Sequence, residues 1–495
     1  MNLTDLTLIE LRDAIARGDA SSVEATQACL SRIGDADGSL RAFLQVFEAE
    51  AMTQARQADE RIAAEGAHAV GALAGVPVAI KDNMCLSWGR TTCASRILEN
   101  YKSPFTGTAV QKLLDAGAVI VGKTNLDEFA MGSSTEHSAF GATRNPWDIE
   151  RTPGGSSGGS ATAVAARMVP ASLGSDTGGS IRQPAAHTGL VGMKPTYGRV
   201  SRWGLVAFAS SFDQIGPFAR NVEDTALMLN VICGADELDS TSANVETPDF
   251  LQTINEPLEG LRLGVPTQSK NDNNHPAVLE AFGGVVAMYQ SLGAEIVPID
   301  LPNIDYGIAA YYIIAPAEAS TNLARYDGIR YGRRAEIGPG DDLEALYAKS
   351  RAEGFGAEVK RRIMLGTYAL SAGYYDAYYK KALQARRIIK NDFDRAFDET
   401  GVHAVLMPTT PDPAFKLGDK TDDPLAMYLE DFYTVAANLA GLPAISFPAG
   451  MAIENGSRLP IGAQLVGPAF DEARLLRIAR MHERATEWHL QKPAS

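Results

Sequence analysis

The feature that most restricts how this chain can fold is its alternation of short apolar runs with helical segments and glycine-rich loops. The first β-rich runs lie at 76–80, 118–121, 169–173 and 205–209. Similar runs return later, at 261–266, 405–408, 444–448 and 461–466. Strands separated by helices are typical of an α/β domain whose sheet is covered on both faces. We therefore predict one such domain over residues 67–490.

Two helical regions accompany this pattern. Thr7 and Glu10 have the spacing of a capping box that starts a helix, and a second box begins at Ser21. Residues 1–66 are predicted to form a helical segment packed on the core. Residues 305–400 are mostly helical and rich in Tyr and Arg, and strand-like runs resume after them. They are predicted to be a helical insertion within the domain.

Composition excludes several classes of protein. Hydrophobic residues make up 45% of the chain and charged residues 21%, so the chain can bury a large core and is not disordered. The 60 acidic residues outnumber the 45 basic ones, which gives a formal net charge of −15. Such a chain should repel a phosphate backbone, so a partner should supply most of the contacts with any RNA.

The expected compartment is the cytoplasm. The four cysteines form no C-x-x-C pair, which fits a reducing environment and offers no zinc site. The first 20 residues show no basic leader followed by an apolar stretch, as a secretory signal would. The longest apolar runs, 72–80 and 281–289, are about half as long as a membrane helix requires. We expect neither a bound metal nor a membrane anchor.

Two familiar motifs occur in contexts that do not support them. Residues 117–124, GAVIVGKT, fit the phosphate-binding P-loop, but the residues between the glycines are themselves a predicted strand and cannot curl round a phosphate. Residues 154–158, GGSSG, fit the nucleophile elbow of α/β-hydrolases, but no buried strand leads into them. We therefore set both interpretations aside.

Two glycine- and serine-rich segments are better candidates for chemistry. Residues 153–160 read PGGSSGGS, residues 174–180 read GSDTGGS, and one helix–strand unit joins them. A flexible linker is the alternative, but linkers are flanked by polar, low-complexity sequence. Successive glycines let backbone N–H groups approach a ligand without obstruction by side chains. The segments are therefore predicted to be catalytic loops that can build an oxyanion hole.

A serine nucleophile in these loops needs a base. His187 follows the second segment and His137 lies in another loop, but single histidines are more often structural. Lys81 directly follows the apolar run 76–80, where it can be partly desolvated. Desolvation can lower a lysine pKa from about 10.4 to about 7–8, at a cost of about 4 kcal/mol that only a dedicated pocket supplies. An exposed surface lysine is the other interpretation of Lys81.

Together, Lys81 and the two segments resemble the signature of the amidase signature family. The second segment continues as Asp176-Thr-Gly-Gly-Ser180-Ile-Arg-Gln-Pro-Ala185, and the family has the same Gly-Gly-Ser followed by I/V-R-x-P-A. The resemblance accounts for all of residues 70–220. It implies an α/β fold in which helices cover both faces of a central mixed sheet.

The same resemblance implies a role for each residue. Ser180 matches the family's nucleophile, Ser156 the bridging serine on a cis peptide bond, and Lys81 the base. The backbone N–H groups that match the oxyanion hole belong to Thr177, Gly178 and Gly179. In this scheme the N–H groups stabilise the oxyanion and a Ser–Ser–Lys relay protonates the leaving nitrogen, without a histidine or a metal.

Within the family, nearly the whole chain resembles the A-subunit branch, the glutamine-hydrolysing subunits of glutamyl-tRNA(Gln) amidotransferases. The helical insertion carries segments that general amidases lack, at 325–332, 358–363 and 373–381. In that branch an Arg, an Asp and a Tyr contact the glutamine. The matching residues here are Arg361 or Arg362, Asp431, and Tyr311 or Tyr312.

This set of side chains fits a zwitterion, because a cation can bind the α-carboxylate and an anion the α-ammonium. The alternative for the Arg pair is a solvated helix face. The alternative for Asp431 is a carboxylate on a helix surface or a charge at a helix N-terminus.

The resemblance implies a glutaminase that hydrolyses glutamine to glutamate and ammonia. The ammonia would serve the conversion of Glu-tRNA(Gln) to Gln-tRNA(Gln) in a heterotrimer with B- and C-type subunits. No cofactor is expected in this chain, whereas ATP, Mg²⁺ and most tRNA contacts are expected on the partner. Two other interpretations are a stand-alone amidase of small or aryl amides and a non-catalytic assembly subunit.

Overall fold

The computed structural model describes residues 2–271 and 273–494, and the strands named here lie within them. They are β1 (Phe43–Val46), β2 (Pro77–Lys81), β3 (Val119–Thr124), β4 (Ala171–Asp176), β5 (Val191–Lys194), β6 (Gln214–Ala219), β7 (Arg262–Pro266), β8 (Glu295–Ile299), β9 (Ala404–Pro408), β10 (Ala444–Glu454) and β11 (Ser457–Val466). Over this part of the chain they form an 11-stranded sheet in the order β1-β3-β2-β4-β6-β5-β10-β11-β9-β7-β8. The sheet is mixed, because β2 runs parallel to β4 whereas β4 runs antiparallel to β6.

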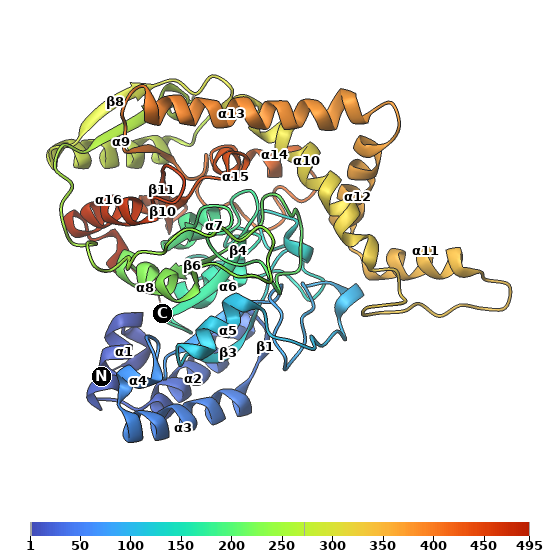
Figure 1. The fold of residues 1–495 in the computed structure, drawn as a ribbon, viewed down its shortest axis with the longest axis horizontal. Helices are drawn as coiled ribbons and strands as arrows, with labels where there is room; N and C mark the ends of the chain where they lie inside the picture. Colours follow the sequence, from blue (N-terminus) through green and yellow to red (C-terminus); the bar gives the residue numbers. More distant parts are fainter. Residues whose placement is uncertain (1, 272, 495) are drawn as a thin grey trace.

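Helices surround the sheet (Figure 1). The α-helices of the described residues are α1 (Leu8–Arg17), α2 (Ser22–Leu40), α3 (Glu48–Glu65), α4 (Ala67–Val70), α5 (Thr108–Asp115), α6 (Gly158–Ala165), α7 (Arg182–Thr188), α8 (Val222–Ile232), α9 (Pro276–Ser291), α10 (Gly307–Asn322), α11 (Leu343–Gly354), α12 (Ala357–Leu370), α13 (Lys380–Asp398), α14 (Pro424–Leu429), α15 (Val435–Ala440) and α16 (Glu472–Ala485). None of them is both long and apolar enough to cross a membrane.

Both faces of the sheet are buried. Alternate residues of a strand point to opposite faces, and in β2 the side chains of Val78 and Ile80 join one apolar cluster while Ala79 joins another. In β9 the same division separates Leu406 from Val405. The predicted α/β fold with a mixed, doubly covered sheet is therefore confirmed.

Two local predictions are wrong. Residues 205–209 contain no strand and make only an isolated bridge, between Leu205 and Met84; the strand comes later, as β6. Residues 1–66 are not purely helical, since β1 pairs antiparallel with β3 at the edge of the sheet. A four-residue edge strand is too short to leave a periodic signal in the sequence.

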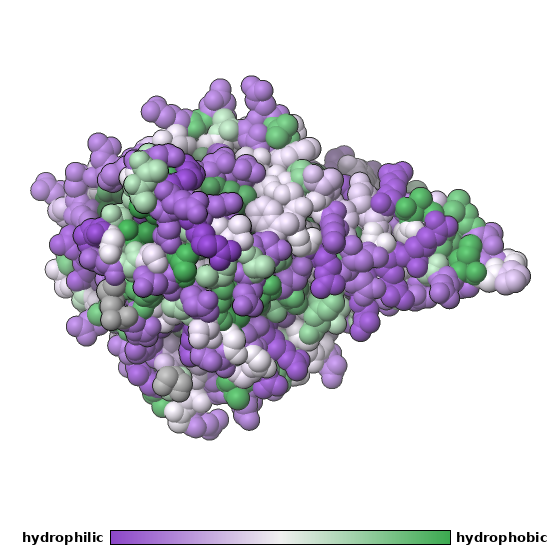
Figure 2. All heavy atoms as spheres, turned by 90° about the horizontal axis from the view of Figure 1, so that it is seen from below, coloured by the Kyte–Doolittle hydropathy of each residue, from purple (hydrophilic) through white to green (hydrophobic). Residues whose placement is uncertain are grey.

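The helical insertion forms a layer of its own. Helix α10 packs against both α12 and α13 beside the sheet, and a narrow arm that carries α11 extends away from the body (Figure 1). Apolar residues gather toward the outer end of the arm (Figure 2). Ile337 and Leu343, the first residue of α11, are exposed. Gly366 lets α12 approach α10 closely, because a Cβ atom there would lie 1.9 Å from the carbonyl oxygen of Pro316.

Candidate active site

Lys81 lies in the interior, not on the surface. It ends β2, is fully buried, and its Nζ lies 2.8 Å from Ser156 Oγ and 2.8 Å from Ser157 Oγ. Ser175 adds a third hydroxyl at 3.0 Å from Nζ. Three hydroxyl groups therefore surround one amine, within hydrogen-bond distance.

Burial changes the protonation of this amine. Removal from water disfavours the ammonium form and lowers the pKa of Lys81 to about 7. The carboxylates that act in the opposite direction belong to Asp127, Asp176 and Asp213. A substantial fraction of Lys81 is thus neutral near pH 7 and can accept a proton.

The two serine-rich segments meet at Lys81. Ser156 follows a cis peptide bond from Gly155, just before α6. Ser180 lies just before α7, with 7% of its surface exposed, and its carbonyl oxygen accepts the N–H of Ser157 at 3.3 Å. Among the described residues, no hydrogen bond joins the hydroxyl groups of Ser156 and Ser180. The structure therefore brings Lys81, Ser156 and Ser180 together, but among the described residues no hydrogen bond yet connects the two serines for proton transfer.

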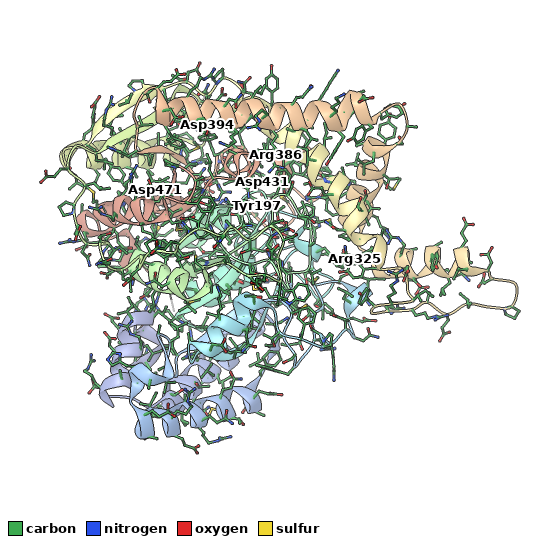
Figure 3. The ribbon with its side chains drawn as sticks, in the orientation of Figure 1. Tyr197, Arg325, Arg386, Asp394, Asp431 and Asp471 are labelled. Atoms are coloured by element: carbon green, nitrogen blue, oxygen red, sulfur yellow. The ribbon has the colours of Figure 1, made fainter. Side chains whose placement is uncertain are left out.

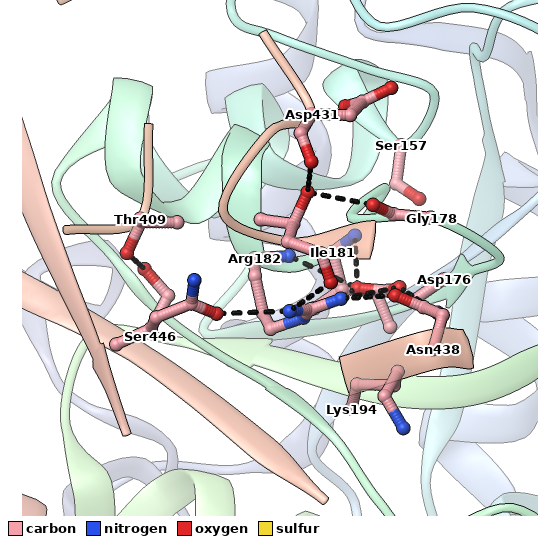
Figure 4. A network of polar contacts seen from close by, with 12 residues as sticks. Ser157, Asp176, Gly178, Ile181, Arg182, Lys194, Thr409, Asp431, Asn438 and Ser446 are labelled. Carbon is pink, nitrogen blue, oxygen red and sulfur yellow. Dashed lines mark hydrogen bonds and ion pairs between the residues drawn. The ribbon is translucent and has the colours of Figure 1, made fainter. Parts of the chain in front are cut away.

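A buried polar network holds the nucleophile loop, which we define as residues 176–182. Asp176 accepts hydrogen bonds from Arg182 Nε at 3.1 Å and Asn438 Nδ2 at 2.8 Å (Figure 4). It also accepts the N–H of Ile181 at 3.2 Å. Within the described residues, the N–H groups of the predicted oxyanion hole, at 177–179, donate no hydrogen bond to the protein. They are free to serve a ligand.

Asp431 lies in a turn between two helices. The apolar residues of 425–440 favour a single helix, but this segment is divided into α14 and α15. Asp431 falls in the gap between them and is nearly fully buried (Figure 3). Its Oδ2 accepts hydrogen bonds from Ser133 Oγ at 2.8 Å and from Tyr312 OH at 3.1 Å. Burial raises its pKa to about 7. The idea of a carboxylate on a helix surface is therefore wrong.

The two arginines of α12 have different environments. Arg362 is 2% exposed and its Nε donates to Glu358 Oε1 at 2.7 Å, whereas 42% of the Arg361 side chain is exposed. Among the described residues, the Nη atoms of Arg362 make no hydrogen bond, so they are available to a carboxylate. The structure thus favours Arg362 over Arg361 as the residue that faces the site.

Both tyrosines border the site, in different ways. A Cβ atom on Gly178 would lie 2.6 Å from the ring of Tyr311, so this ring packs directly on the nucleophile loop. Tyr312 stacks on Tyr428 with ring centroids 3.6 Å apart, and the guanidinium of Arg362 lies 5.2 Å from the Tyr312 ring centroid. The aromatic rings join the serine–lysine cluster to the arginine and the aspartate.

Comparison with known proteins shows the family of the chain. The model of the Amidase family matches residues 24–476. The chain belongs to the amidase family. This amidase is 56% identical over 493 residues to the A-subunit of the glutamyl-tRNA(Gln) amidotransferase of Carboxydothermus hydrogenoformans, and the match covers 100% of both chains.

Solved structures resemble this amidase as well. The crystal structure of the glutamyl-tRNA(Gln) amidotransferase A-subunit from Thermotoga maritima has 44% sequence identity and a TM-score of 0.78, over 98% of this chain and 95% of that one. The native peptide amidase from Stenotrophomonas maltophilia has 30% identity and a TM-score of 0.80, over 97% of each chain.

The histidines do not form part of the serine cluster of the amidase. His187 is buried, its Nε2 lies 3.3 Å from the carbonyl oxygen of Asp412, and burial lowers its pKa to about 4. Over residues 2–271 and 273–494, no hydrogen bond joins His137 or His187 to Ser156 or Ser180, and no three His, Cys, Asp or Glu side chains are arranged to hold a metal ion.

Several residues of the site escaped sequence reasoning. They are Ser133, Ser157, Ser175, Glu358 and Tyr428. Ser157 and Ser175 lie inside the two segments singled out above, so their position was a signal. Glu358 begins the segment 358–363, which the resemblance had also singled out. Ser133 and Tyr428 lie in none of the segments named above, because their role depends on which distant helix packs beside them.

Proposed function

We propose that this amidase hydrolyses glutamine to glutamate and ammonia as one subunit of a tRNA-dependent amidotransferase. One observation carries the proposal: a buried serine–lysine cluster adjoins an arginine and an aspartate suited to the two charges of a free amino acid. The likeness to subunits named for glutamyl-tRNA(Gln) amidotransferase supports the same assignment.

The chemistry begins at the neutral amine of Lys81. It accepts a proton from Ser156, which takes one from Ser180 as Ser180 attacks the side-chain amide carbon of glutamine. N–H groups of the nucleophile loop stabilise the oxyanion, at about 3–4 kcal/mol for each donor. The relay returns the proton to the leaving nitrogen, so ammonia departs and an acyl-enzyme on Ser180 remains. Water, deprotonated by the same relay, then releases glutamate.

Substrate binding uses the helical insertion, residues 305–400, as one side of the pocket. The Nη atoms of Arg362 bind the α-carboxylate and Asp431 binds the α-ammonium. Tyr312 holds Asp431 in place, and Tyr311 closes the pocket against the nucleophile loop. This arrangement favours glutamine over small neutral amides, which lack both charges.

The ammonia passes to partner chains, B- and C-type subunits of a heterotrimer. The partner holds ATP and Mg²⁺ and makes most of the contacts with the misacylated tRNA. The net charge of −15 supports this division, because a strongly acidic chain is a poor ligand for a phosphate backbone.

The variant Ser180→Ala, in a complex assembled with the partners, tests the proposal. Glutamine hydrolysis and glutamine-dependent formation of Gln-tRNA(Gln) should be lost, whereas formation from added ammonium salt should persist, because only the source of ammonia is removed. Loss of the ammonia-dependent reaction in a well-assembled complex would contradict it, as would failure of the chain to copurify with two partners.

A further inference from the structure

Thr434 connects the turn that carries Asp431 to the nucleophile loop. It is fully buried, and its hydroxyl donates to the carbonyl oxygen of Gly178 at 2.7 Å. Its own N–H donates to the carbonyl oxygen of Asp431 at 3.0 Å. Its carbonyl oxygen accepts from Arg182 Nη1 at 3.0 Å. One residue thus contacts both sides of the site through three different groups.

The Thr434 hydroxyl has two carbonyl oxygens within reach, and within the described residues only one of them lacks another donor. The carbonyl oxygen of Asp431 is also within reach, at 3.1 Å, but it already accepts the N–H groups of Thr434 and Val435, each at 3.0 Å. Within the described part of the chain, the carbonyl oxygen of Gly178 has Thr434 as its sole donor. A buried carbonyl without a donor is unfavourable, so the proton belongs to Gly178.

This hydrogen bond fixes the direction of a peptide unit. In a trans peptide the C=O and N–H groups point in opposite directions, so a Gly178 carbonyl held toward Thr434 aims the Gly179 N–H away from it. Gly179 has a φ of +145°, and a Cβ atom there would lie 2.3 Å from Thr434 Oγ1. Because Thr434 lies so close, only glycine fits at position 179.

We propose that Thr434 is a positioning residue: its hydroxyl orients the Gly178–Gly179 peptide so that the Gly179 N–H can stabilise the oxyanion. The inference rests on the proposed function, which supplies the oxyanion. It also explains why the turn with Asp431 and the nucleophile loop lie in direct contact, since substrate binding and oxyanion stabilisation then share one support.

The test compares Thr434→Val with Thr434→Ser in the assembled complex. Val keeps the branched shape and removes the hydroxyl, so kcat for glutamine hydrolysis should fall by at least about tenfold while KM changes by less than about threefold. Ser keeps the hydroxyl and should remain within about threefold of the parent kcat. Thr409→Val is the matched control, because Thr409 is also buried and its hydroxyl pairs with Ser446 Oγ at 3.0 Å rather than with a residue of the nucleophile loop.

A second readout does not depend on glutamine. The rate at which a fluorophosphonate labels Ser180 should fall in Thr434→Val and not in Thr409→Val, because the phosphoryl oxygen needs the same N–H groups. An unchanged kcat and labelling rate, or a raised KM alone, would overturn the inference; if Val does not fold, Thr434→Ala replaces it. A parent complex without glutaminase activity would instead refute the proposed function. The labelling rate of Ser180 would still show whether Thr434 positions the nucleophile loop.

Discussion

Lys81 must be neutral to accept a proton, so its titration should set the acid limb of the pH profile. Because burial lowers its pKa to about 7, the neutral form prevails above that pH and disappears below it. We expect kcat for glutamine hydrolysis to fall as the pH drops through about 7, approaching tenfold per pH unit. Steady-state rates at saturating glutamine between about pH 5.5 and 8.5 measure this. A kcat that stays constant over the range would exclude Lys81 as the base.

Arg362 and its neighbour Arg361 provide a matched pair for the substrate pocket. Arg362→Lys keeps the charge but loses the two parallel donors, so KM for glutamine should rise about 30-fold or more with a smaller change in kcat. Arg361→Lys should change KM by less than about threefold, because its side chain is 42% exposed. Equal effects of the two substitutions on KM would show that the assignment is wrong.

For individual residues, the sequence predicts which side chains carry the chemistry better than it predicts how those side chains are placed. Lys81, Ser156 and Ser180 are recognisable because they lie in contiguous motifs, and the fold only has to bring three motifs together. Arg361 and Arg362 are adjacent, and their side chains leave the helix about 100° apart. Only the packing of α12 against its neighbours decides which one is buried, and no residue within the motif records that packing.

Helix α12 depends on a glycine for its position. Gly366→Ala improves helix propensity by about 1 kcal/mol, but its Cβ would lie 1.9 Å from a backbone oxygen of α10. We expect the clash to dominate and lower the free energy of unfolding by about 1–3 kcal/mol. Because α12 carries Arg362, KM for glutamine should also rise.

The control for this variant is Gly283→Ala in α9, where a Cβ atom would meet nothing within 4 Å. It should raise the free energy of unfolding by about 0.5–1 kcal/mol. Thermal melts of both variants would reveal the opposite signs. A stabilised Gly366→Ala would mean that α10 and α12 can separate at little cost.

The break between α14 and α15 is the feature whose absence from the sequence pattern matters most, because it positions Asp431. Apolar residues continue across 425–440, and the one proline, Pro424, lies at the start of α14 rather than at the break. The turn is stabilised instead by distant partners, through Ser133 and Tyr312 on Asp431. Tertiary contacts override local propensity here.

The charge of the whole molecule leads to a prediction about tRNA. At −15 the isolated chain should bind free tRNA weakly at about 0.15 M salt. One of its few clustered cations, Arg333, is already paired with Glu99 and Glu353. Filter binding with the purified chain, and with the assembled complex as the control, measures this. Tight binding by the chain alone would show that it carries a tRNA site of its own.

The order of the strands also bears on how the molecule is made. The middle of the sheet pairs β5 with β10, and Thr434 lies 256 residues beyond Gly178. Since a ribosome adds about 5–20 residues per second, the nucleophile loop waits on the order of tens of seconds for its support. During that time the edge of β5 is open to wrong partners, which is the situation in which nascent chains need chaperones. The chain therefore becomes catalytically competent only late in its synthesis. An unfinished chain already contains Lys81, Ser156 and Ser180, but it does not yet release ammonia in the wrong place.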